Sequence, residues 1–172
     1  MKWIYGIGAA VLLAACLLAA NATGEQIGLA NAAAGNPENG LTSLILFMDA
    51  ATLPKLAMIL CALMLMGGAP LAMVGLILAL TRQAGGARVF EIMLGAGGAA
   101  MALLGAAAGL YSETLNLQAA AATHTTDLGI LAPSRAESFM SVSVGAFTGF
   151  VLLAAALIIC LVRLARTPRP TA

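Results

Sequence analysis

The chain has 172 residues, of which 62% are hydrophobic and only 9% are charged, and its mean hydropathy is +1.01. Soluble domains are far less apolar than this, so the composition predicts an all-α integral membrane protein surrounded by membrane lipid. A formal net charge of +1 and the lack of a glycine-rich loop ending in Gly-Lys-Ser argue against nucleic acid as a partner.

The N-terminal segment 1–22 contains Lys2, then an apolar run, then Ala20-Asn21-Ala22. This pattern is typical both of a cleaved secretory signal peptide and of an uncleaved first transmembrane helix, and both readings stay open. The polar segment 23–53 is rich in turn residues such as Gly35-Asn36-Pro37 and ends in a short apolar run. It predicts an extracytoplasmic linker followed by an interfacial segment.

Three later stretches are apolar and each is long enough to cross a bilayer core, which takes roughly 20 residues of helix. They predict transmembrane helices at 54–81, 89–112 and 138–164, an extracytoplasmic loop at 113–137 and a cytoplasmic tail at 165–172. The chain therefore has three to four transmembrane helices.

Orientation follows from the positive-inside rule. Six basic residues fall on one side of the predicted spans, against Lys55 and Arg135 on the other, and these six are Lys2, Arg82, Arg88, Arg163, Arg166 and Arg169. The distribution predicts a multi-pass protein whose 82–88 connection and C-terminal tail are cytoplasmic.

Small residues recur at helical spacing in the last two spans. One stripe predicts close helix packing in the third apolar span, and a second, matching stripe predicts it in the fourth. The residues are Gly98, Ala102, Gly105 and Gly109 in the first stripe, and Ser138, Ser141, Gly145 and either Thr148 or Gly149 in the second. We expect the two helices to pack as a hairpin or against copies of themselves, and a homo-oligomer.

No constellation of catalytic residues emerges. Cys16, Cys61 and Cys160 show no Cys-x-x-Cys spacing, and the chain has a single His. We therefore predict no metal site and no cofactor. A nucleophile, a base and an orienting group do not occur together at membrane depth, so we also predict that the protein is not an enzyme.

Two motifs resemble those of the MotA/TolQ/ExbB proton-channel family. The first is Leu103-Leu104-Gly105-Ala106-Ala107-Ala108-Gly109-Leu110, similar to the family's Leu-x-Gly-Thr-x-x-Gly-Ile. The second is Leu131-Ala132-Pro133-Ser134-Arg135-Ala136-Glu137-Ser138, similar to Val-Ala-Pro-Gly-Ile-Ala-Glu-Ala. The resemblance implies a pore-type hairpin formed by the last two helices, a place in the bacterial inner membrane and a single-span partner of the ExbD/TolR type.

On this reading, Glu137, Ser141 and Ser143 are candidates for an ion pathway. A carboxylate that enters an apolar span is costly and usually faces water or a partner. The alternative is that Glu137 only interacts with the positive end of a helix dipole, as we also expect of Glu91.

The chain also departs from the family's pattern. Ala106 and Val142 replace two threonines associated with the ion path, and only about ten residues join the spans where the relatives carry a cytoplasmic domain. A non-conducting membrane scaffold or assembly subunit with a degenerate version of the fold is therefore the alternative function.

The orientation is testable by cysteine accessibility. Gly86→Cys and Thr167→Cys should be labelled by an impermeant reagent only in inverted vesicles, because the basic residues hold both segments in the cytoplasm. Labelling of either position in intact cells would refute this topology.

Overall fold

The structure, a computed structural model, describes residues 11, 13–19, 50–81, 83–124 and 128–166. Residues 13–19 are helical, and three long helices follow: α3 (Thr52–Leu80), α4 (Ala84–Thr123) and α5 (Leu128–Arg166). Each of the three is long and apolar enough to cross a membrane. The described residues are all-helical, and three of their helices could span a membrane, as a multi-pass membrane protein requires. Most of the predicted linker 23–53 and of the tail 165–172 lies outside the described residues.

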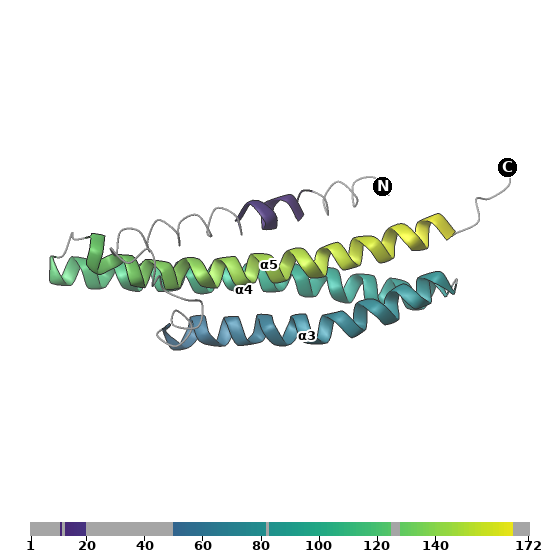
Figure 1. Cartoon of the computed structure of the whole chain (residues 1–172), viewed down its shortest axis with the longest axis horizontal. Helices are drawn as coiled ribbons and strands as arrows, with labels where there is room; N and C mark the ends of the chain where they lie inside the picture. The colour runs from purple at the N-terminus through teal and green to yellow at the C-terminus, as the bar shows by residue number, and fades with distance from the viewer. Residues whose placement is uncertain (1–10, 12, 20–49, 82, 125–127, 167–172) are drawn as a thin grey trace, which may run out of the picture.

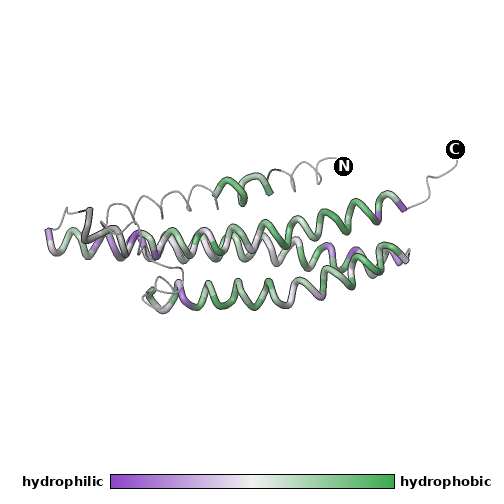
Figure 2. The backbone as a smooth tube through the Cα atoms, viewed as in Figure 1, coloured by the Kyte–Doolittle hydropathy of each residue, from purple (hydrophilic) through white to green (hydrophobic). Residues whose placement is uncertain are grey.

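The three helices lie side by side along one axis (Figure 1). Large apolar side chains point outward along them, including Met66, Leu103 and Ile158, which are 75%, 71% and 53% exposed. Figure 2 shows that apolar residues run along most of each helix. Such a surface is stable when hydrocarbon rather than water covers it, because the hydrophobic effect opposes the exposure of apolar side chains to water.

The small residues of α4 and α5 pack against one another within one chain. A Cβ atom added to Gly105 would lie 2.6 Å from Cα of Gly145, and one added to Gly98 would lie 2.9 Å from the carbonyl oxygen of Gly149. Ala102 contacts Gly149 in the same interface. The two stripes are thus covered by intrachain packing, and self-association of the chain stays a prediction.

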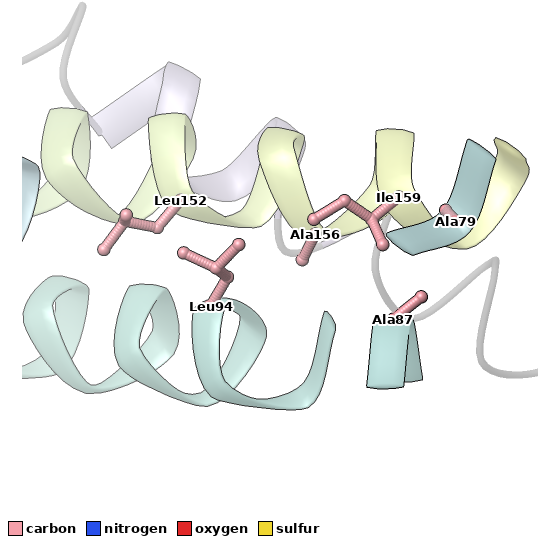
Figure 3. Close-up of a cluster of buried hydrophobic side chains, with 6 residues drawn as sticks. All are labelled: Ala79, Ala87, Leu94, Leu152, Ala156 and Ile159. Carbon is pink, nitrogen blue, oxygen red and sulfur yellow. The ribbon is translucent and has the colours of Figure 1, made fainter. Parts of the chain in front are cut away.

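Helix α3 packs against the other two near the α3–α4 connection. Gly75 permits this approach, because a Cβ there would lie 2.8 Å from atoms of both Phe90 and Ile159. Figure 3 shows the cluster of buried side chains that joins the three helices, consisting of Ala79, Ala87, Leu94, Leu152, Ala156 and Ile159. Helix α3 also contains Pro70, which removes a backbone hydrogen bond and explains why its C-terminal part rises toward the other helices in Figure 1.

The prediction of a loop at 113–137 is wrong for most of that segment. Helix α4 continues to Thr123 and α5 already begins at Leu128, so the hairpin is longer than the apolar spans. The run of alanines at 119–122 favours helix, and His124 ends α4 in the left-handed conformation, with φ of 52°. The polar residues of this segment are therefore carried on helix rather than on an irregular loop.

The hairpin therefore exceeds the membrane thickness. At 40 and 39 residues, α4 and α5 are each about 60 Å long, against about 30 Å for a hydrocarbon core. Helix α3 has 29 residues, and Figure 1 shows the hairpin extending beyond its N-terminal end. We infer that the polar tip of the hairpin projects from the bilayer.

The close approach of the hairpin helices is testable with alanine. Gly105→Ala and Gly145→Ala should each destabilise the folded protein by about 1–3 kcal/mol, because the new Cβ overlaps the facing backbone. Thermal unfolding in detergent, followed by circular dichroism, measures the change.

Gly67→Ala is the matched control, since its added Cβ meets no atom within 4 Å from the described residues beyond its own stretch of helix backbone. This variant should be neutral, or more stable by up to about 1 kcal/mol through helix propensity. Equal loss in all three variants would contradict the packing argument.

Candidate ion pathway along α5

Glu137 lies well inside α5 rather than at its N-terminus. The helix begins at Leu128, nine residues earlier, and its first turn contains no acidic residue. The helix dipole acts mainly on groups in the first turn, so the alternative in which Glu137 only interacts with the N-terminal end of a helix dipole is wrong. Glu137 is half-buried, and its carbonyl oxygen accepts a hydrogen bond of 3.4 Å from Oγ of Ser141.

Glu137, Ser141 and Thr148 lie on one side of α5. At about 100° per residue, these three positions fall within about 40° of one another and span about 16 Å along the axis. Ser141 and Thr148 are 1% and 0% exposed, so this side faces the other helices. We call these three residues the polar line.

Ser143 does not belong to the polar line. It lies about 200° around the helix from Ser141 and is half-buried. The structure thus brings Glu137 and Ser141 together and separates them from the third predicted residue. Thr148, which the sequence offered only as an alternative member of the packing stripe and not of the ion pathway, follows Ser141 by seven residues, and that two-turn spacing places both on one side of the helix.

The interface between α4 and α5 is closed beside the polar line. A Cβ on Gly105 would lie 2.7 Å from the carbonyl oxygen of Ser141 and 2.6 Å from Cα of Gly145. Backbones this close leave no room between them for a water molecule. A proton that moves along the polar line therefore requires α4 and α5 to separate at this level.

Thr148 is the least satisfied polar residue on the line. Its Oγ1 is buried next to the Cys61 thiol of α3, and among the described residues no group makes a hydrogen bond of good geometry to it. The thiol instead donates to Sδ of Met101 in α4, with the two sulfurs 4.0 Å apart. A buried polar group without a partner costs about 1–3 kcal/mol, so this position calls for an explanation.

An ion pair holds each end of the hairpin together. At the tip, Arg135 contacts Glu113 at 3.3 Å, and nearby Asn116 donates a 3.2 Å hydrogen bond to Ser138. At the opposite end, Nε and Nη2 of Arg163 lie 3.0 and 2.9 Å from the same Oε2 atom of Glu91.

Glu91 consequently has a different role from the predicted one. Helix α4 begins at Ala84, so Glu91 lies beyond its first turn and its partner is an arginine rather than the helix dipole. Arg166 lies at the same end and donates a 3.1 Å hydrogen bond to the carbonyl oxygen of Leu80. Two of the basic residues used to predict orientation therefore lie together beside the α3–α4 connection.

Among the described residues, no group of three or more His, Cys, Asp or Glu side chains is placed to hold a metal ion. Fold and site together define an all-helical, multi-pass membrane protein with a polar line on its most buried span. Comparisons with protein-family models, curated proteins and solved structures found no match.

The ion pair between Glu91 and Arg163 should stabilise the bundle. Both side chains are only about a fifth exposed, at 21% and 20%, and the arginine makes two contacts to one carboxylate oxygen. Glu91→Gln should lower the free energy of unfolding by about 1.5–3 kcal/mol, the range for hydrogen bonds to charged groups. Thermal unfolding in detergent measures this change.

Glu113→Gln is the matched control, because the Arg135 side chain of that pair is 43% exposed. Solvent screens this pair more strongly, so the loss should be about 1 kcal/mol or less. A larger loss at Glu113 than at Glu91 would contradict the assignment.

Proposed function

We propose that this chain is a subunit of an energy-transducing proton channel of the TolQ/ExbB type. It acts in the bacterial inner membrane and couples proton flow to work through a single-span partner. The observation that carries the proposal is the polar line, in which a carboxylate and two hydroxyls occupy one side of α5. Among the described residues, no group makes a hydrogen bond of good geometry to one of these hydroxyls, that of buried Thr148. A helix that serves packing alone gains nothing from an unsatisfied hydroxyl.

The chemistry of the three side chains suits proton transfer. Glu137 exchanges a proton with water at the mouth of the span, and the hydroxyls of Ser141 and Thr148 each donate and accept hydrogen bonds. Successive members of the line are about 6 and 10 Å apart along the axis, so water must enter between them for a proton to pass. The closed contact at Gly105 and Gly145 is then the resting arrangement of the subunit.

A partner helix completes the pathway. The apolar cores of the spans, residues 56–80, 92–112 and 138–162, contain no acidic residue of their own. An acid at mid-span depth has to come from another chain, and a single-span partner of the ExbD/TolR type supplies one. Several copies of this chain would enclose such a helix, so the proposal includes a homo-oligomer of this chain.

A non-conducting scaffold is the second candidate, and the closed interface favours it. Ser141 lies within the contact between α4 and α5, where a small side chain is needed whether or not ions flow. Ala106 and Val142 further remove hydroxyls from the neighbourhood of the line. On this reading the hairpin is a rigid element on which other membrane proteins assemble.

Proton flux into liposomes that contain the chain and its copurified partner separates the two candidates. Glu137→Gln should lower flux by about 100-fold or more, because Gln keeps the shape of the side chain but does not titrate. Ser141→Ala and Thr148→Val should also lower flux, since each removes a hydroxyl of the polar line.

Ser143→Ala is the matched control, because it removes a hydroxyl on the other side of the same helix and should leave flux unchanged. Expression and oligomer size are measured for every variant. Unchanged flux in Glu137→Gln would exclude the transport role of this residue and leave the scaffold as the better account.

A further inference from the structure

Three side chains from three different helices meet at one buried point. Cys61 of α3, Met101 of α4 and Thr148 of α5 are 1%, 8% and 0% exposed. Sγ of Cys61 and Sδ of Met101 lie 4.0 Å apart, and the thiol donates to the thioether. The point thus combines a thiol, a thioether and a hydroxyl, away from water.

The unpartnered hydroxyl indicates what this point lacks. Oγ1 of Thr148 lies next to the Cys61 thiol but makes no hydrogen bond of good geometry to any described residue, although a threonine in a helix commonly donates to a carbonyl of its own preceding turn. A thiol is a weak acceptor, whereas a thiolate is a strong one. Ionised Cys61 would therefore provide the acceptor that Thr148 is missing.

A thiolate at this depth needs a positive partner. An isolated charge inside an apolar span is costly, and the apolar cores of the spans, 56–80, 92–112 and 138–162, contain no Lys or Arg. A monovalent cation bound to one thiolate leaves the site neutral, while a divalent ion would leave one positive charge unbalanced. Thiolate and thioether sulfurs are soft ligands that suit Cu(I), zinc and iron–sulfur clusters, and Cu(I) is the monovalent ion among these.

We propose that Cys61 and Met101 bind one soft monovalent metal ion of the Cu(I) type, with the Thr148 hydroxyl donating a hydrogen bond to the thiolate. The Cys61 thiol loses its proton to solvent as the sulfur–metal bond forms, and the oxidation state of the metal does not change. This site ties the three helices together at one point. The inference goes beyond the proposed function and holds whether or not the protein conducts protons.

Competition for Cu(I) tests the site. The full chain in detergent is titrated against Cu(I) held by bicinchoninate under ascorbate, and we expect one Cu(I) bound per chain. Cys61→Ala and Met101→Leu should each lower the affinity by at least about tenfold, and Thr148→Val should lower it by about 10–100-fold, as loss of a supporting hydrogen bond does at metal sites. X-ray absorption of the complex should show sulfur ligands.

Cys160→Ala and Met66→Leu are the matched controls, because they remove a cysteine and a methionine elsewhere in the chain and should leave the affinity unchanged. Met101→Leu conserves volume, so it reports on the ligand even if Cys61→Ala fails to fold. Failure of the wild type to withdraw Cu(I) from the chelator, or wild-type affinity in Met101→Leu, would overturn the proposal.

Discussion

The contact between Gly105 of α4 and Gly145 of α5 is the constraint on which the rest of the bundle depends. Without side chains at these positions, the two backbones approach until an added Cβ would lie 2.6 Å from the facing Cα. Lipid provides no hydrophobic force that favours one helix pair over another, so close van der Waals contact of this kind decides which helices associate. The absence of a side chain at Gly105 and at Gly145 therefore specifies the pairing of α4 with α5.

This contact also determines where polar groups can lie. Because α4 and α5 touch along their small residues, Ser138 and Ser141 are buried between the two helices. Asn116 of α4 donates a hydrogen bond to Ser138 across this interface. Ion pairs then close the hairpin at both ends, where the charged side chains are partly exposed. The same register that buries the serines places Glu91 opposite Arg163, so packing and electrostatics select a single alignment of the two helices.

Helix α3 is the third helix of the bundle, and it contributes a buried thiol, that of Cys61, to the contact with the hairpin. Its Gly75 lets it pack close to α4 and α5, and its Cys61 meets Met101 and Thr148 inside the apolar region. Buried polar and sulfur groups at such a point are expensive to leave unsatisfied, which makes them sensitive to any ligand or movement that satisfies them. Proton transfer and metal binding are two different ways to do so.

The sequence by itself determined the membrane spans and the two small-residue stripes, because apolar run length and residue spacing are local properties. Only the tertiary structure decided how these parts are used. It aligned the polar parts of α4 and α5, which the sequence predicted as a loop, so that Glu113 and Arg135 meet across the hairpin. It also replaced Ser143 by Thr148 on the polar line, because the burial of a hydroxyl depends on which faces of two neighbouring helices meet. The seven-residue spacing places Thr148 on the same side of α5 as Ser141, but which side of the helix is buried depends on contacts between segments far apart in the chain.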